Sequence, residues 1–471
     1  MKAFVRVSTL VVFAACVASA DAAITVAPGY ALRRIPTPDV VQGGVVRSGN
    51  AILVGQGTFG PGGERVVRLD GSTATTVADG FGSFGGFDLD AAGTLYVTDN
   101  CYTGDFGCAA ATTGDTLYAI PTALTRTTTA PAGTSTVLPN GALPFAQDVL
   151  VVPGAVLVTD GAGPGAGRVV QVVGTTPTDL ITGLDYTAGL ALDGSTLLVG
   201  NSNFPSPASV FKYSLAGVSL GTLVSGLSGE YGVAVDGTGN ALVTGGFAPD
   251  FSSSVEAVDA GGTVTERARG FGFTADVFYD AARDAALVLD FGVSEIASIC
   301  RDANADGVCD IDCASPVGFD SVEVKFGGVE TPAGDDKLAV KAEVTVANPI
   351  IDPVGNGLKL WLDDANAVVV ADVVLPPGAY DGGTRIGWRL NQAGTAWTFK
   401  HPTGVVGVTR ASVRAVGGSP GTFRVKLRGR KAGYGLTGSV GPLRAGIALS
   451  ATQCATGALT CPATGNTRKC E

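Results

Sequence analysis

The chain contains a single histidine, His401, among 471 residues. No residue between 24 and 299 can therefore supply the imidazole of a Ser-His-Asp triad, a His–Asp general base or a histidine-ligated metal, unless His401 reaches across from another domain. The C-x-x-C spacing is also absent. No Lys-Ser/Thr follows the glycine-rich loops at 60–63 and 161–167, which argues against a phosphate cradle.

Charge is scarce as well, at 15% of residues, which is too little for a disordered polyelectrolyte. The net charge of −11 argues against nucleic acid as a partner. Beyond the N-terminus, no apolar run is long enough to span a membrane. Glycine is abundant, at 69 residues without a Gly-X-Y period, and 45% of the chain is hydrophobic. This composition is typical of short strands joined by tight turns around one or two cores.

The N-terminus has the features of a secretory signal peptide over residues 1–20. Lys2 and Arg6 precede an apolar run at 7–15, and Ala18-Ser19-Ala20 resembles a cleavage site. We therefore expect an exported protein, secreted or periplasmic. Two alternatives remain open. Cys16 closes a loose lipobox and could carry a lipid anchor to the cell envelope, or the segment could be a buried first helix.

Without Cys16, eight cysteines remain in three groups, an even number that suits an oxidising compartment. We expect Cys101 and Cys108 to close their own loop. The groups at 300–313 and 454–470 hold three cysteines each, so full oxidation requires at least one disulfide between them. Free or metal-bound thiols are the alternative.

Charge divides the chain. Residues 24–299 carry 25 acidic and 11 basic side chains, whereas residues 314–471 carry 12 acidic and 17 basic ones. We expect two domains, at 24–299 and 314–450, joined by an Asp- and Cys-rich linker at 300–313 and followed by a Cys-rich tail at 451–471. Alternating polar and apolar residues predict an antiparallel β-sandwich for the second domain. Its three tryptophans could pack in that core or stack on sugars.

The first domain repeats one unit of two apolar strands around a turn, as at 86–99, 189–201, 232–245 and 276–290. The turn aspartates of the last three copies are 43 and 44 residues apart, the length of a four-stranded propeller blade. Weaker copies at 43–56 and 147–160 bring the number of blades to six. The strand expected near residues 23–35 would complete the last blade. The turn aspartates, such as Asp90 and Asp236, suit hydrogen bonds to backbone N–H groups two residues on.

The G-x-x-x-D-x-x-G-x-L-x-V pattern of these copies resembles the NHL-repeat and gluconolactonase-like six-bladed propellers over roughly residues 24–299. The resemblance implies a ligand site at one mouth of the channel, where gluconolactonase-like enzymes hold a divalent metal with a Glu, Asn and Asp set. Asn100, Asn201, Asp148 and Asp290 could imitate that set, although no glutamate occupies the ring. The candidate ligand-binding residues are Gln56, Asn100, Asp148, Asp160, Asn201 and Asp290.

The linker contains Asp302, Asn304 and Asp306 at positions 1, 3 and 5 of an EF-hand-type loop, followed by Gly307. Hard oxygen donors alternating along a loop are what calcium binds. The interleaved cysteines resemble thrombospondin type 3 calcium repeats, and a solvated acidic linker is the alternative. The candidate calcium ligands are Asp302, Asn304, Asp306, the Val308 carbonyl, Asp310 and Asp312.

Two functions of different classes follow. One is an exported binding or scaffold protein that takes a small molecule, glycan or protein at the channel mouth, with structural calcium in the linker. The other is a metal-dependent lactonase or esterase-type hydrolase of the gluconolactonase kind. The missing histidine and glutamate favour the first.

Overall fold

The computed structural model describes residues 23–471, apart from 72, 104, 106, 162, 204–205, 230–231, 246–252, 330–333, 437–441, 451 and 465–466. The expected signal peptide and the lipobox at Cys16 lie outside the described residues. The chain divides into two compact units. Unit 1 comprises the described residues up to Ala27 with Thr37–Arg68 and Thr75–Ile299, and unit 2 comprises Pro28–Pro36, Leu69–Ala74 and Cys300–Glu471.

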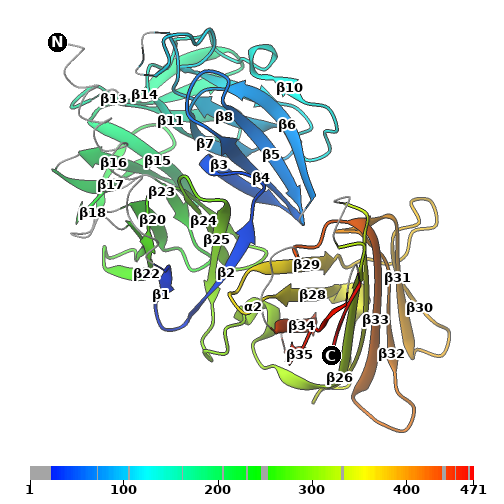
Figure 1. Cartoon of the computed structure of the whole chain (residues 1–471). Helices are drawn as coiled ribbons and strands as arrows, with labels where there is room; N and C mark the ends of the chain where they lie inside the picture. Colours follow the sequence, from blue (N-terminus) through cyan, green and yellow to red (C-terminus); the bar gives the residue numbers. More distant parts are fainter. Residues whose placement is uncertain are drawn as a thin grey trace. The chain divides into compact units, whose positions relative to one another are not determined.

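The first part of the chain forms a six-bladed β-propeller, as expected from the repeats (Figure 1). Blade 1 contains β3 (Val41–Ser48), β4 (Ala51–Gly57), β5 (Glu64–Asp70) and β6 (Thr73–Phe81), with β10 (Ala130–Pro131) at its edge. Blade 2 contains β7 (Phe84–Leu89), β8 (Leu95–Asp99) and β9 (Thr116–Ile120). Blade 3 contains β11 (Ala146–Val152), β12 (Ala155–Asp160), β13 (Gly167–Val173) and β14 (Thr176–Leu184).

Blades 4 to 6 follow in chain order. Blade 4 contains β15 (Tyr186–Asp193), β16 (Thr196–Asn203), β17 (Ser206–Ser214) and β18 (Ser219–Leu227). Blade 5 contains β19 (Val233–Val235), β20 (Ala241–Gly245), β21 (Ser253–Val258) and β22 (Val264–Phe271). Blade 6 contains β23 (Thr274–Asp280), β24 (Ala285–Asp290) and β25 (Glu295–Arg301), and its sheet order is β2-β25-β24-β23.

The N-terminal segment forms two strands, whereas the sequence predicts one. β1 (Thr25–Val26) pairs antiparallel with β22 at the edge of blade 5. β2 (Tyr30–Pro36) is the outermost strand in the sheet of blade 6. An unpaired outer edge would expose backbone N–H and C=O groups, so these strands protect two sheet edges.

The turns within the blades are built as the repeats predict. The Asp90 carboxylate accepts hydrogen bonds from the backbone N–H groups of Ala92 (2.9 Å) and Thr94 (2.8 Å). Asp236 does the same with the N–H groups of Thr238 (2.8 Å) and Asn240 (3.0 Å). These aspartates are turn residues, which leaves the chemistry of the propeller to other positions.

Unit 2 contains one curled β-sheet with the strand order β29-β28-β34-β35-β26-β27-β33-β32-β31-β30, to which β37 and β36 are added beside β26 (Figure 1). The first half consists of β29 (Val369–Leu375), β28 (Leu358–Asp363), β34 (Leu443–Ser450) and β35 (Gln453–Leu459). The second half consists of β26 (Val317–Gly327), β27 (Asp336–Thr345), β33 (Thr422–Ala432), β32 (Val408–Ala415), β31 (Ala396–Val405), β30 (Gly387–Leu390), β36 (Ala463–Thr464) and β37 (Thr467–Cys470).

The two halves of this sheet enclose one core, which gives the expected sandwich. Leu360 and Ile447 from the first half and Val340, Phe399 and Leu427 from the second belong to the same buried cluster. A short parallel pairing joins the halves, with Val317 opposite Ala455. Of the tryptophans, Trp361 and Trp388 are buried, and the Trp388 indole N–H donates to the Pro376 carbonyl oxygen (3.0 Å). Trp388 packs in this core and Trp361 packs in a separate buried cluster with Val308, Cys313 and Cys454, so neither can form a sugar-stacking platform at the surface.

Four disulfides connect the eight described cysteines. Cys101–Cys108 closes a loop in the propeller, as expected. Cys300–Cys309 and Cys461–Cys470 are also local, whereas Cys313–Cys454 spans 141 residues of sequence and is the expected bridge between the second and third groups. Disulfides at this density indicate folding in an oxidising compartment. Within the described part of the chain, no helix is long and apolar enough to cross a membrane.

Candidate functional site

Six inner strands, β3, β7, β11, β15, β19 and β23, surround the axis of the propeller and contact one another in a closed ring. In five of them the pairing register shifts near the start of the strand, as between Ala146 and Val149 of β11. Such bulges change the direction in which side chains point, and they occur often at the rims of barrels and beside functional sites. The residues at this bulge line the central channel.

Aligning the six inner strands on the bulge shows one repeated position. Four blades have glycine there, at Gly44, Gly86, Gly189 and Gly232, whereas blade 3 has Asp148 and blade 6 has Asp276. Blades 3 and 6 are three steps apart in a ring of six, so these two carboxylates lie on opposite sides of the channel.

Both aspartates connect neighbouring blades. Asp148 accepts the N–H of Val149 (2.8 Å) in its own strand and that of Leu190 (2.6 Å) in blade 4. Asp276 likewise accepts the N–H of Val277 (2.8 Å) and that of Val45 (2.9 Å) in blade 1. Charge-assisted bonds of this kind are among the stronger hydrogen bonds in proteins. The two carboxylates therefore hold the ring together at opposite points.

A third carboxylate repeats this arrangement further along blade 2. Asp88 accepts the N–H of Leu89 (2.7 Å) and, from blade 3, that of Val151 (2.6 Å). Burial raises the pKa of Asp88 and of Asp276 to about 6 in each case. Burial, reinforced by the charge of Asp276, also raises the pKa of Asp148 well above its usual range. The channel thus brings together three carboxyl groups whose pKa values burial raises above the usual range.

The glycines at the bulge are required by close packing. A Cβ atom at Gly86 would lie 1.8 Å from Asp148 Oδ1, and one at Gly189 would lie 2.3 Å from the backbone nitrogen of Val233. Neither distance is possible for a real side chain. The inner strands approach each other closely because four blades lack a side chain here.

The predicted ligand residues at the ends of the second strands contact the backbone of their own blades. Asp160 accepts the Phe145 N–H (2.8 Å), and Asn201 accepts the Asp185 N–H (2.8 Å) through Oδ1. Asp290 accepts the N–H groups of Gly272 (3.0 Å) and Phe273 (2.8 Å). Asp160 also forms an ion pair with Arg168 (2.6 Å). These side chains fix the loops that enter the first strands, so the channel mouth has a rigid rim.

Gln56 occupies the equivalent position in blade 1 and behaves differently. It is fully buried, and neither atom of its amide group has a hydrogen-bond partner among the described residues. The neighbouring Gln42 donates from Nε2 to the Gly57 carbonyl oxygen (2.7 Å), and its Oε1 has no partner within the same described part. Asn100, next to the rim, donates its backbone N–H to the Ser83 carbonyl oxygen (2.9 Å). Gln56 and Gln42 therefore have unused hydrogen-bonding capacity.

The linker loop folds its side chains onto its own backbone. Asp302 accepts the N–H groups of Asp306 (3.1 Å) and Gly307 (2.8 Å), and Asp310 accepts that of Ala303 (3.1 Å). Gly307 has a φ of 77°, the left-handed conformation expected at the sharp turn. The side chain of Asp312 lies outside the described residues. Across the described residues, no three His, Cys, Asp or Glu side chains lie close enough together to hold a metal ion.

Asp148 is among the candidates predicted from the sequence, whereas Asp88 and the pairing of Asp148 with Asp276 are not. A sequence pattern does indicate this pair of carboxylates, because only blades 3 and 6 have aspartate in place of the repeated glycine. Glu64, at the start of β5, is also not predicted; it is buried and accepts the Phe84 N–H (2.6 Å) from blade 2. Burial raises the Glu64 pKa well above its usual range.

The fold and the channel define a protein class, the six-bladed β-propellers, here followed by a β-sandwich. Solved structures with a related fold include a gluconolactonase from Xanthomonas campestris, with 15% identity and a TM-score of 0.39 over 59% of this chain and 99% of that one. The calcium-binding protein regucalcin from Agrobacterium tumefaciens has 15% identity and a TM-score of 0.39 over 54% and 82% of the two chains. A luciferin-regenerating enzyme has 11% identity and a TM-score of 0.43 over 60% and 98%.

At these identities and scores the likeness carries no functional argument. No family model matches the chain, and no curated protein matches it. The function must therefore be argued from the residues of the channel and the linker.

Proposed function

We propose that this chain is an exported binding protein whose propeller takes a polar ligand at the channel mouth, beside blade 1. The observation that carries the proposal is the amide of Gln56, which is fully buried and has no hydrogen-bond partner among the described residues. A buried polar group without a partner costs about 1–3 kcal/mol. A ligand with hydroxyl or carbonyl groups would supply the missing partners, as a polar anchor does in a preformed site.

The rim supports recognition over hydrolysis. Asp160, Asn201 and Asp290 direct their oxygens to backbone N–H groups of their own blades, and Asp148 bridges two blades. A metal-dependent lactonase would need three or four oxygens that converge on one ion. The propeller segment also lacks a histidine that could act as a general base.

The test uses a panel of neutral sugars and aldonolactones as probes, with thermal shift as the readout. We expect at least one probe to raise the melting temperature of the wild type and to have no effect on Gln56→Met. Methionine fills a similar volume without an unsatisfied amide, so this variant should be at least as stable as the wild type without ligand. If no probe distinguishes the two proteins, the ligand site is not at Gln56.

A second experiment decides between binding and catalysis. Lactone hydrolysis is measured with calcium, zinc or manganese for the wild type, Asp148→Ala and Asn201→Ala. We expect no metal-dependent turnover in any of the three. Turnover that requires metal and is lost in either variant would replace the binding proposal with the lactonase alternative.

The proposal includes a structural calcium ion in the linker. Asp302, Asn304, Asp306 and Asp310 offer only hard oxygens, and the Val308 carbonyl would add another, which is the donor set that calcium prefers. Cys300–Cys309 and Cys313–Cys454 fix both ends of the segment. Bound calcium would screen the neighbouring carboxylates from one another and stiffen the loop.

Scanning calorimetry with calcium or a chelator tests this site. Extracellular modules bind calcium with a Kd of roughly 0.1–1 mM, so millimolar calcium would stabilise the wild type by about 1 kcal/mol. We expect a small upward shift in the wild type and none in Asp306→Ala. If the wild type and Asp306→Ala give identical melting curves with calcium and with chelator, the linker has no calcium site.

A further inference from the structure

The outer face of the second half of the unit 2 sheet is strongly basic. The strands β30, β31, β32, β33, β27 and β26 lie side by side in this half, and β37 pairs with β26 (Figure 1). Inward positions such as Phe399, Val413, Val425 and Val340 belong to the core. Because side chains alternate along a strand, the residues between them point outward.

These outward positions form what we call the basic face. Its cationic side chains are Lys325, Lys337, Lys341, Arg389, Lys400, Arg410, Arg414, Arg424, Lys426, Arg428, Arg430 and Lys469. Among the described outward residues of these strands, the carboxylates are Glu323, Glu343 and Asp320, whose Oδ2 accepts the Thr345 hydroxyl (2.7 Å). Glu323 pairs with Lys325, Lys341 and Lys469, and Glu343 pairs with Arg424. The other eight cations are exposed and have no carboxylate partner among the described residues.

Like charges lie directly opposite each other across neighbouring strands of this face. Arg410 is opposite Arg428, and Arg414 is opposite Arg424. Lys337 and Lys341 of β27 are opposite Arg430 and Lys426 of β33, respectively. Cross-strand pairs of like charge are destabilising. A chain with a net charge of −11 has no general excess of cations to distribute, so this concentration needs a partner that neutralises it.

We propose that the basic face binds an acidic polysaccharide, a chain of sugars bearing carboxylate or sulfate groups. The backbone positions of these cations are about 4.8 Å apart on adjacent strands and about 6.7 Å apart two residues along one strand, so the face is a regular lattice of positive charge. Such a lattice fits a linear polymer with regularly repeated anions. Arginine forms paired hydrogen bonds with carboxylate and sulfate-like groups, which adds geometry to the attraction.

The outward residues of this face favour a polysaccharide over other polyanions. The uncharged ones among them are small or polar, such as Ala339, Ser412 and Thr398. Single-stranded nucleic acid is held by several bases stacked on aromatic side chains, whereas the described outward positions of these strands carry no aromatic ring and Tyr380 lies beside them, 5.9 Å from Lys400 Nζ. A surface that lies on a membrane buries large apolar side chains, which are also missing there. The four disulfides indicate an oxidising compartment.

This inference concerns unit 2 and does not depend on the ligand proposed for the propeller. The probes are heparin for sulfate groups and polygalacturonate for carboxylate groups, with double-stranded DNA and anionic lipid vesicles as the competing classes. Binding is measured by calorimetry as a function of salt, because each neutralised contact releases counterions. We expect the full-length protein to bind one of the two polysaccharides more tightly than DNA or vesicles, with an affinity that falls as salt rises.

The central variant is Lys400→Gln/Arg410→Gln/Arg428→Gln, which neutralises three cations aligned across β31, β32 and β33. Loss of three charge-assisted contacts should weaken binding at least about tenfold and reduce the salt dependence. The matched control, Arg65→Gln/Lys212→Gln/Arg269→Gln, removes the same charge from the propeller and should bind like the wild type. Arg410→Lys/Arg428→Lys keeps the charge and should retain most of the affinity.

Three results would overturn the proposal: equal weakening in the control, wild-type binding that is insensitive to salt, or tighter binding to DNA or vesicles than to both polysaccharides. The melting temperature of each variant is measured first. Should the central variant fail to fold, the salt dependence of the wild type and the ranking of the four probes still decide the question.

Discussion

At the scale of single residues, each channel aspartate has two opposing effects on stability. Asp88, Asp148 and Asp276 each accept one N–H from their own strand and one from the next blade, which favours the ionised carboxylate. Burial penalises the same ionised form and is the larger effect, since the pKa of all three groups is raised. The propeller should therefore become less stable as these groups lose their protons.

Asp88 gives a direct test of this conclusion. Its pKa is about 6 in the folded protein and about 3.9 in an unfolded chain. The stability that it contributes is complete below about pH 4 and is lost as pH rises through about 6, a change of roughly 3 kcal/mol. In Asp88→Asn the free energy of unfolding should lack this decrease, although the variant starts lower because the amide can accept only through Oδ1. Urea unfolding between about pH 3.5 and 7.5 measures both curves, with the exposed turn variant Asp193→Asn as control. If the free energy of unfolding falls equally with pH in the wild type and in Asp88→Asn, the ionisation of Asp88 does not cause the decrease.

The glycine at the channel bulge gives a second prediction at this scale. A Cβ atom at Gly86 would collide with Asp148, whose Oδ1 is held by the Val149 N–H. Gly86→Ala should therefore lower the free energy of unfolding by about 1–3 kcal/mol, the usual cost of overpacking. Gly417→Ala is the control, because no atom lies within 4 Å of its added Cβ, and it should change stability by less than about 0.5 kcal/mol. Denaturant unfolding compares the two variants, and equal effects would show that crowding in the channel is not the reason for the glycine.

At the scale of strands, the basic face combines stability and binding in one element. On β33, Arg428 lies between Arg410 on one side and Ala339 on the other, so its charge is repelled within the sheet. Arg428→Thr removes this repulsion and introduces a residue that suits a strand. We expect the variant to be more stable by about 0.2–1 kcal/mol and to bind the polysaccharide less tightly.

The control for this change is Lys212→Thr on β17, where the cross-strand neighbours are Leu198 and Gly221. Without a like charge opposite, the substitution should not stabilise the protein. The melting temperatures of the three proteins, measured at low salt where repulsion is strongest, check the prediction. A loss of stability in Arg428→Thr would mean that the arginine is part of the packing of the sheet.

The strand patterns in the sequence predict the fold, but they predict only some of the contacts at the candidate site. The repeats gave six blades because each copy contains the same two apolar strands and an Asp turn, and alternation gave the sandwich because one face of each strand is buried. Alternation does not specify which strands pair, so the short parallel step from β26 to β35 was not predictable. The hydrogen bonds of Asp88 to Val151 and of Glu64 to Phe84 join different blades, and no local pattern encodes them.

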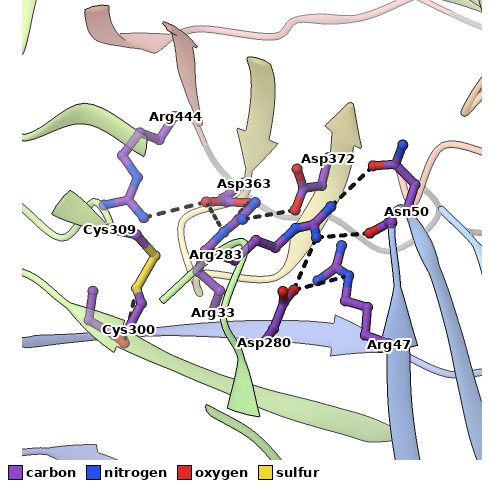
Figure 2. Close-up of polar contacts among 12 residues, drawn as sticks. Arg33, Arg47, Asn50, Asp280, Arg283, Cys300, Cys309, Asp363, Asp372 and Arg444 are labelled. Atoms are coloured by element: carbon purple, nitrogen blue, oxygen red, sulfur yellow. Dashed lines mark hydrogen bonds and ion pairs between the residues drawn. A yellow bond between two sulfur atoms is a disulfide. The ribbon is translucent and has the colours of Figure 1, made fainter. Parts of the chain in front are cut away.

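At the scale of the whole chain, the N-terminal segment is tied to residues far along the sequence. In unit 2, the Arg33 guanidinium contacts both oxygens of Asp363, at 2.7 Å from Nη2 and 3.0 Å from Nε, across 330 residues (Figure 2). Its Nη1 also donates to Asp372 (3.2 Å). Arg444 forms a second ion pair with Asp363, with 3.5 Å between Nη2 and Oδ2. Asp363 is 0% exposed and Arg33 is 6% exposed. A sequence pattern could not reveal this pair, because nothing local to Arg33 indicates a carboxylate so distant in the chain.

Because both charges are buried, removing one should cost far more than removing both. Arg33→Met leaves Asp363 without its main partner, and we expect it to lower the free energy of unfolding of unit 2 by about 3–5 kcal/mol. Arg33→Met/Asp363→Leu replaces the pair with apolar side chains of similar size and should recover at least half of that loss, since the fully buried charge of Asp363 is removed together with its partner. Denaturant unfolding of the full-length proteins, followed by the fluorescence of the buried Trp361 and Trp388, reports on unit 2 because both lie in it. If the single variant loses less than about 1 kcal/mol, or the double variant is as unstable as the single one, the pair does not hold the N-terminal segment in place.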